Sequence, residues 1–477
     1  MRVEAAARLQ LVALACALLA GCALLRPAPA WERPPPPVAE GPVVPQERLH
    51  RTTLANGLEL LVLEDHALPR LEVGLLLRRG AEIEPLEQAG AVALMADVME
   101  RGAGERDALA LARAVEEIGA DLAVGADMDS VSVELSGLSG DAGLLFDLLA
   151  DVALRPRFDA REVARARAET QAALLREKDD PGALLSRHLA ATLYEGHRYG
   201  LPVDGSPDTV ARLDAATLRA LHERLFVARN AIAYVVGDID VQDAVAHVQA
   251  RFGGWAAGEP PEPGPPPPAQ TPPARRVVVV DRPDMGQARL ALAHEGIART
   301  DERRVAAGLM NTILGGGGFL SRLMSRVRAD EGLAYGVGSG FAMRRHPGPF
   351  VISTSTRAPE AGRVVDILLE EAERLRREGP GQDELRNARS LSAGRFVLGL
   401  ETSAAIAGAL VELDVYGLPR DALDTYRTRL NDVEPEEVLE AARTLLHPER
   451  MAIVAVGSAE VLRPQLERFG PLEVVKP

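Results

Sequence analysis

A proline-rich segment in the middle of the chain does most to limit how this protein can fold. Residues 258–274 read GEPPEPGPPPPAQTPPA and contain nine prolines. Proline has a fixed φ angle and no backbone N–H, so such a segment forms neither a helix interior nor a sheet interior. We therefore interpret it as a linker between two bodies of similar length, residues 47–257 and residues 275–477.

The two bodies carry the same landmarks in the same order. Near the end of each, a β-branched run leads into a glycine turn (NAIAYVVGDID and MAIVAVGSAE), and Gly237 and Gly457 are 220 residues apart. Near the start of each lies an apolar helical run (GAVALMADVMERG and RVAAGLMNTILGG), in which Leu94 and Leu309 are 215 residues apart. Two landmarks at nearly one offset favour an internal duplication.

Each body mixes strand-like and helical patterns. Runs such as LELLVLED and SVSVELSGL have the composition and alternation of strands, whereas AREVARARAETQAALLREK has the spacing of an amphipathic helix. Paired strands beside grouped helices predict an α+β fold in which helices cover one face of each sheet.

The first 22 residues have the layout of a signal peptide, because two arginines precede a short apolar run. The run ends Leu19-Ala20-Gly21-Cys22, which resembles the lipobox of bacterial lipoproteins. We expect residues 1–21 to be removed and Cys22 to be lipidated; an ordinary secretory signal is the alternative. Residues 22–46 would then form a proline-rich tether. Alanine rather than aspartate follows the cysteine, which favours the outer membrane, facing the periplasm.

Several segments, taken in order, resemble the insulinase-like (pitrilysin, M16) metallopeptidases, in the subgroup of mitochondrial processing peptidase and its bacterial relatives. The first body contributes Arg79-Gly80, GAVALMADVMERG and residues 116–138 and 177–214, and the second contributes GGGGFLSRLMSRVRADEGLAYGVGSGF. The resemblance covers nearly the whole mature chain. It implies two homologous domains of the mitochondrial-processing-peptidase-like metallohydrolase type, each a mainly antiparallel sheet covered by helices.

The zinc site of that family is missing here. In the family, His-x-x-Glu-His on the first long helix and a distant glutamate hold zinc and activate a water molecule. Aligning the glycines that flank the helix places Ala93 and Asp97 at the two histidines and Ala96 at the glutamate. The distal ligand falls at Ala172 or Ala173. The resemblance therefore implies a degenerate site in which every ligand and the base are replaced.

The histidines make the same point without any alignment. The closest two of the nine, His188 and His197, are nine residues apart, so none pair at helical ligand spacing. Asp97 is then either a solvated or hydrogen-bonded carboxylate or, with another carboxylate, a weak site for a hard cation. His197-Arg198-Tyr199-Gly200 we interpret as a loop turn. We predict no metal or other cofactor in this chain and expect zinc in a partner chain.

The second body keeps more of the family pattern. Arg328 and Tyr335 match an arginine–tyrosine pair that the family offers across the cleft to substrate near the zinc; a surface arginine and a core tyrosine are the alternative. A run of four glycines precedes them, which we expect to form a flexible or closely approached loop rather than a helix interior. It resembles the substrate-contacting loop of non-catalytic processing-peptidase subunits, or it is a permissive connector: Gly315, Gly316, Gly317 and Gly318.

Two functions follow from these patterns. The first is a non-catalytic subunit of a periplasmic, membrane-anchored M16-type zinc peptidase, which is inactive alone and forms a dimer with a zinc-bearing homologue. The second is a peptide-binding or scaffold lipoprotein that has no enzymatic partner and could form a homodimer. We find no nucleophile–base arrangement that would support an autonomous hydrolase. A net charge of −15 argues against nucleic acid as a partner.

Overall fold

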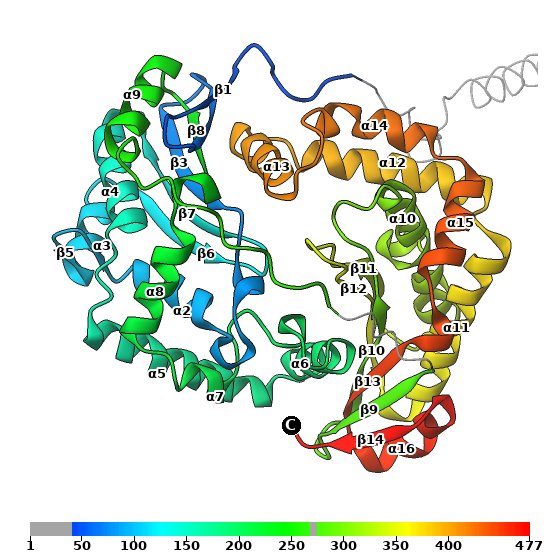
Figure 1. Ribbon diagram of the computed structural model, residues 1–477. Helices are drawn as coiled ribbons and strands as arrows, with labels where there is room; N and C mark the ends of the chain where they lie inside the picture. The colour runs from blue at the N-terminus through cyan, green and yellow to red at the C-terminus, as the bar shows by residue number, and fades with distance from the viewer. Residues whose placement is uncertain (1–40, 268–273) are drawn as a thin grey trace, which may run out of the picture. The chain divides into compact units, whose positions relative to one another are not determined.

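The computed structural model describes residues 41–267 and 274–477 (Figure 1). The predicted signal peptide, Cys22 and the tether up to residue 40 lie outside the described residues. Two six-stranded sheets form the framework, with strand orders β1-β2-β8-β3-β7-β6 and β11-β12-β10-β13-β9-β14. The strands are β1 (Leu49–Thr53), β2 (Glu59–Glu64), β3 (Arg70–Leu77), β6 (Asp121–Ala126), β7 (Val131–Leu138), β8 (Ala231–Gly237), β9 (Arg276–Asp281), β10 (Gln287–Glu295), β11 (Val337–Phe341), β12 (Pro349–Arg357), β13 (Ala452–Gly457) and β14 (Leu472–Val475), with a short separate pair β4 (Gly102–Ala103) and β5 (Arg106–Asp107).

The two sheets share one topology when the second is followed backwards. The parallel pair β2/β8 corresponds to β9/β13, and the antiparallel series β8-β3-β7-β6 corresponds to β13-β10-β12-β11. The outer edges differ, since β1 pairs antiparallel with β2 and β14 pairs parallel with β9. Mainly antiparallel sheets with helices confirm the α+β prediction, and the shared topology agrees with an internal duplication.

Helices flank both sheets (Figure 1). In the first half α4 and α9 pack on the sheet and α2 contacts β6, while in the second half α11 and α16 pack on the sheet. The helices are α2 (Ala91–Met99), α3 (Ala108–Glu116), α4 (Ala142–Leu154), α5 (Ala160–Arg176), α6 (Pro181–Leu193), α7 (Pro207–Val210), α8 (Ala215–Leu225), α9 (Val241–Phe252), α10 (Arg304–Asn311), α11 (Ala361–Glu378), α12 (Gln382–Leu398), α13 (Ser403–Tyr416), α14 (Ala422–Asp432), α15 (Pro435–Leu445) and α16 (Ala459–Leu466).

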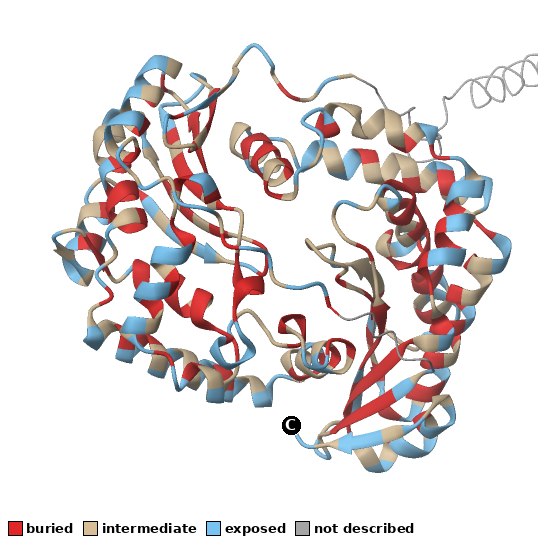
Figure 2. Ribbon diagram, in the orientation of Figure 1, coloured by how far each residue is buried: buried red, intermediate tan, exposed pale blue. Residues whose placement is uncertain are grey.

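Two helices are exchanged between the halves. Helix α13 of the second half packs on β2 and β8 of the first sheet, and helix α6 of the first half packs on β10 and β13 of the second sheet. Strand β8 shows the reason, because all but its last residue are buried (Figure 2). Val235 faces the main core, and its neighbours Tyr234 and Val236 face α13. Successive strand residues point to opposite faces, so an apolar strand of this kind requires a cover on both.

The exchanged helices begin at capped positions. Asp180 Oδ1 accepts hydrogen bonds from the N–H groups of Gly182 and Ala183 at 2.6 and 3.3 Å. Thr402 Oγ1 accepts one from Ala405 N–H at 3.1 Å. Such caps satisfy donors that a helix end leaves unpaired. The described part of the linker, residues 258–267, forms neither helix nor strand, as predicted.

Among the described residues, no single helix is both long enough and apolar enough to cross a membrane. Helices α12 and α13 would meet that test only together, and they are bent by 109° where they join.

Candidate functional site

Helix α2 carries the three positions at which the resemblance places zinc chemistry. Ala96 is buried, whereas Ala93 and Asp97 are half-buried, so this face of the helix is partly open to solvent. The alanine methyl groups can neither bind a metal ion nor accept a proton from water. Of these three positions, only Asp97 carries a side chain that could bind a metal ion.

An arginine already holds the carboxylate of Asp97. Arg101, one helical turn further on, donates from Nη2 to both Asp97 oxygens at 2.9 Å. The same nitrogen donates to Glu169 Oε2 on α5 at 2.8 Å, and Arg165 donates to Glu169 at 2.9 Å. The hydrogen bonds from Arg101 and Arg165 lower the pKa of Glu169. A fixed guanidinium therefore bridges the two carboxylates and opposes the binding of a divalent cation between them.

Ala173, the predicted position of the distal ligand, lies on α5 with its side chain exposed. Ala172, beside it, is exposed too. Glu169 precedes Ala173 by four residues and therefore shares its helix face. The spacing of four residues between Asp97 and Arg101 indicates an ion pair in the sequence itself. The part played by Glu169 could not be predicted from the sequence, because only the packing of α5 on α2 brings Glu169 next to Arg101.

The edge of the first sheet beside α2 is blocked at its centre. Strand β6 pairs with β7, and no strand from the described ranges, 41–267 and 274–477, lies on its other side. Glu100, which follows α2, accepts a hydrogen bond at Oε1 from the N–H of Val124 in β6 at 2.6 Å. An extended peptide joins a sheet edge by bonding to such outward backbone groups. Glu100 therefore competes with a peptide for the middle of this edge.

The glycine run begins at Gly315, within a helical turn that follows α10, so the prediction that the run is not helical is wrong for its first two residues. Thr312–Gly316 form a π-helical turn that continues α10. The predicted close approach is present, because a Cβ on Gly315 would lie 2.7 Å from the backbone nitrogen of Ser339 in β11. Packing against β11 thus outweighs the low helix propensity of glycine. Gly318 has φ +61°, a left-handed conformation that glycine adopts without strain.

Beyond the glycines, Phe319 lies beside the predicted arginine–tyrosine pair. The guanidinium carbon of Arg328 is 4.6 Å from the ring centroid of Phe319 and 4.5 Å from that of Tyr335. Arg328 Nη1 also donates to the backbone oxygen of Tyr335 at 2.8 Å. Phe319 is 71% exposed and Tyr335 is 86% exposed, so the alternative of a core tyrosine is wrong. We call Phe319, Arg328 and Tyr335 the aromatic–arginine cluster.

The loop motif around His197 is structural, as interpreted. Arg198 is buried, and its Nε donates to Glu84 Oε2 at 2.8 Å. His197 Nε2 hydrogen-bonds the backbone oxygen of Pro265 in the linker at 2.9 Å. These contacts hold the turn in place.

One group of potential metal ligands occurs among the described residues, at the end of β2 and the start of α9. Glu64, His66 and Asp240 bring three ligand atoms within 4.8 Å of one another. The group is largely exposed, and Glu64 Oε1 already accepts a hydrogen bond from the N–H of Val241 at 2.7 Å. It uses none of the positions implied by the resemblance.

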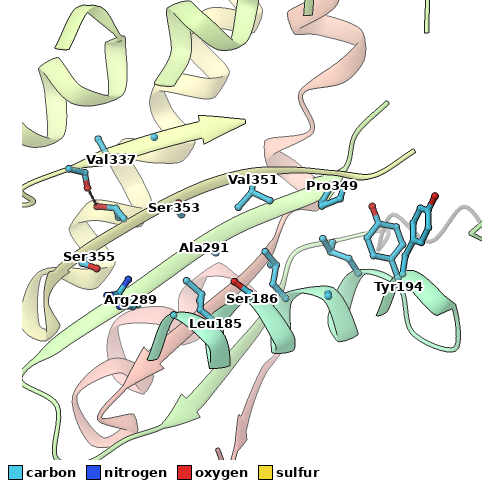
Figure 3. A pocket seen from close by; sticks show the side chains of 18 of the residues that line it. Leu185, Ser186, Tyr194, Arg289, Ala291, Val337, Pro349, Val351, Ser353 and Ser355 are labelled. Carbon is cyan, nitrogen blue, oxygen red and sulfur yellow. Dashed lines mark hydrogen bonds between the residues drawn. The ribbon is translucent and has the colours of Figure 1, made fainter. Parts of the chain in front are cut away.

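Tyr335 also borders a cavity of about 670 Å³ between α6 and the strands β10, β11 and β12 (Figure 3). The exchange of α6 creates this cavity, since its walls come from both halves of the chain. It is an accessible site in addition to the aromatic–arginine cluster.

Comparison with known proteins agrees with the fold. Residues 60–206 match the family model described as Insulinase (Peptidase family M16), and residues 212–392 match the model of the Peptidase M16 inactive domain. A solved structure of a peptidase M16 inactive domain from Pseudomonas fluorescens is 30% identical, with a TM-score of 0.80, and the match covers 86% of this chain and 98% of that one. A protease from Helicobacter pylori shares the fold, with a TM-score of 0.78 at 19% identity over 86% and 99% of the two chains.

Relatives of known sequence point the same way. An uncharacterized zinc protease of Streptomyces coelicolor is 27% identical over 89% of this chain and 90% of its own length. Another from Mycobacterium tuberculosis is 28% identical over 83% and 90%. The chain belongs to the insulinase-like M16 peptidase family.

Proposed function

We propose that this protein is the non-catalytic subunit of an M16-type zinc peptidase, and that it supplies the aromatic–arginine cluster to the active site of a zinc-bearing homologue. One observation carries the proposal: the catalytic positions of the first half hold alanines and an aspartate that is paired with Arg101, while the cluster of the second half is exposed. The chain retains what contacts substrate and lacks what performs hydrolysis.

The chemistry of the cluster suits this role. Two flanking rings and one hydrogen bond to Tyr335 O hold the guanidinium of Arg328 in place. Its other N–H groups and the phenol of Tyr335 are donors for a peptide carbonyl or for the oxyanion that forms during hydrolysis. Such donors act more strongly once a partner excludes water. An exposed group of large aromatic side chains is itself typical of an interaction surface.

The first half supports the same proposal, because it lacks the groups that hydrolysis requires. Ala96 stands where a general base would be needed, and Arg101 opposes a cation beside Asp97. Glu100 obstructs the β6 edge at which a peptide would align with a neighbouring metal. Zinc and its activated water must then come from the partner chain.

The cellular location belongs to the proposal as well. Residues 1–21 would direct export, and lipidation of Cys22 would anchor the chain in the outer membrane, facing the periplasm. Replacing Cys22 with serine should release the protein from the membrane fraction. The second candidate, a peptide-binding lipoprotein without an enzymatic partner, is favoured by the cavity beside α6.

The test is purification of the full chain from membranes, followed by peptidase assays of the chain, its stoichiometric partner and their complex. We expect hydrolysis in the complex only. Arg328→Ala should lower kcat/KM of the complex by about 100-fold, the effect of losing one donor to the oxyanion. Arg224→Ala, which changes an exposed arginine on α8, is the matched control. Zinc-dependent hydrolysis by the chain alone, or an unchanged complex with Arg328→Ala, would refute the proposal.

A further inference from the structure

The cavity between α6 and the second sheet has an apolar middle. Its walls there come from one side of α6 and from three strands, as Figure 3 shows. Leu185, Leu189 and Leu193 of α6 face Ala291 of β10, Val337 of β11 and Val351 of β12. A volume of about 670 Å³ is in the range of sites that enclose a small ligand or a few residues of a peptide.

One end of the cavity is cationic. Arg289 of β10 lines it together with Ser355 of β12, its partner in the strand register, and Figure 3 places the two at the same end. Ser353, which pairs with Ala291, and Ser186 line the middle of the cavity. Among the described residues, no acidic side chain forms an ion pair with Arg289 and no hydrogen bond engages its guanidinium. An arginine that lines a cavity without a carboxylate partner is complementary to an anionic ligand, most directly to a carboxylate that takes two parallel hydrogen bonds.

The opposite end is aromatic. Tyr194 and Tyr199 lie there, and the guanidinium of Arg344 stacks 4.8 Å from the ring centroid of Tyr199. Tyr194 donates its hydroxyl to the backbone oxygen of Pro347 at 3.2 Å. Arg344 is thus a second guanidinium on the cavity wall, but it is already stacked on Tyr199. We therefore place a free carboxylate at the Arg289 end and apolar side chains in the middle of the cavity.

We propose that this cavity binds the carboxyl-terminal residues of an apolar peptide, with the terminal carboxylate on Arg289 and the hydroxyl of Ser355. The aliphatic side chains of the peptide lie on Leu189, Ala291 and Val351. Tyr335, which precedes β11 and also belongs to the aromatic–arginine cluster, borders the cavity at the Arg289 end. The peptide therefore extends away from Tyr335, toward Tyr194. A peptide fits better than a single acyl chain, because the serine hydroxyls along the wall can bond to backbone amides.

This site goes beyond the proposed function, since capture of a carboxyl terminus requires neither zinc nor a partner subunit. It can therefore be tested on the purified chain, and its failure would leave the subunit proposal untouched. The reverse also holds, because loss of partner-dependent hydrolysis says nothing about binding at Arg289.

The experiment is a calorimetric titration with an N-acetylated Ala-Ala-Val-Leu peptide, with its carboxyl-terminal amide and with dodecanoate. We expect the free acid to bind at least about tenfold more tightly than the amide, as loss of one charge-assisted hydrogen bond predicts. Arg289→Ala should remove that difference and Arg224→Ala should not. Ser186→Trp, a substitution at an exposed position on α6, should block binding without unfolding the protein. Equal affinity for acid and amide, or tighter binding of dodecanoate than of the peptide, would overturn the proposal.

Discussion

Helices α2 and α10 occupy corresponding places in the duplicated fold, yet their surroundings differ in one decisive respect. Each packs on the corresponding helix of its half, α2 on α8 and α10 on α15. After α2 the chain supplies Arg101, which satisfies Asp97 and Glu169 internally. After α10 it supplies the glycine run and an arginine that two exposed rings hold toward solvent. In the first half the charged groups that follow this helix are paired with one another. In the second half the arginine that follows it stands between exposed aromatic rings.

Each half contributes one exchanged helix that covers the sheet of the other half. Weakening the packing of either helix should therefore have the largest effect on stability. Leu184 on α6 and Leu410 on α13 are 3% and 1% exposed. We expect Leu184→Ala and Leu410→Ala each to lower the free energy of unfolding by about 2–5 kcal/mol, because each leaves a cavity in a core. Urea denaturation measures this. Leu109→Ala, at a position 60% exposed on α3, should change it by about 0.5 kcal/mol or less. A mild effect at only one of the two core sites would show that the exchange is not equivalent.

The junction between the halves should make stability depend on pH. Burial, which outweighs the attraction of Arg345 across the junction, raises the pKa of Glu82 to about 8. Asp129 adds to this rise, while Arg79 opposes it. Between about pH 4.5 and 8 the folded protein retains a proton that the unfolded chain releases, so stability falls as pH rises through this window and levels off above it.

Thermal unfolding at several pH values tests this expectation. Glu82→Gln removes the titrating group, so the part of the decline between pH 4.5 and 8 that Glu82 causes should disappear. Glu87→Gln, which changes an exposed carboxylate nearby, should retain the full decline. Identical pH profiles for the natural protein and Glu82→Gln would contradict the assignment.

Restoring the family's zinc ligands in the first half tests whether Arg101 opposes a metal ion there. The combined variant Ala93→His, Ala96→Glu and Asp97→His restores the family's helix ligands but leaves Arg101 next to them. We expect Arg101→Ala, added to this variant, to tighten zinc binding by about tenfold or more, since close like charges repel by about 1–4 kcal/mol. Calorimetry with zinc measures the change. Arg165→Ala is the control, because Arg165 contacts Glu169 and not Asp97; an equal gain there would show that Arg101 is not the obstacle.

The aromatic–arginine cluster should matter least to stability. Phe319 is 71% exposed, so Phe319→Ala should lower the free energy of unfolding by about 0.5–1 kcal/mol at most, the value of an exposed cation–π contact. Phe350→Ala, at a fully buried strand position, should cost about 3–5 kcal/mol. Denaturant unfolding of both variants compares them, and a large loss at Phe319 would mean that the cluster serves the fold rather than a partner.

Much of the fold could be predicted from local pattern. The linker prolines, the offset between Gly237 and Gly457 and the strand and helix periodicities led to two α+β bodies, and the structure and the comparisons agree with that fold class. The loss of histidine ligands was also visible in the sequence, because a missing side chain type needs no coordinates. The roles of Cys22 and of the substrate contacts stay predictions.

The remaining features depend on contacts between residues far apart in the chain. The amphipathic patterns of α6 and α13 say that each helix has an apolar face, but not that the face is covered by the other half's sheet. The helical turn at Gly315 forms because β11 packs closely against it, which overrides propensity. Glu169, Phe319 and the Arg289 cavity each acquire a partner or a neighbour only through packing.

The sequence by itself therefore determined the duplication, the fold class and the absence of the family's zinc ligands, since periodicity and residue type are local properties. Only the tertiary structure decided what replaced the metal site and where an accessible site remains. Whether a charge is paired or exposed depends on which helices and strands pack against each other. That packing is determined by the burial of apolar side chains throughout the core and not by any one segment.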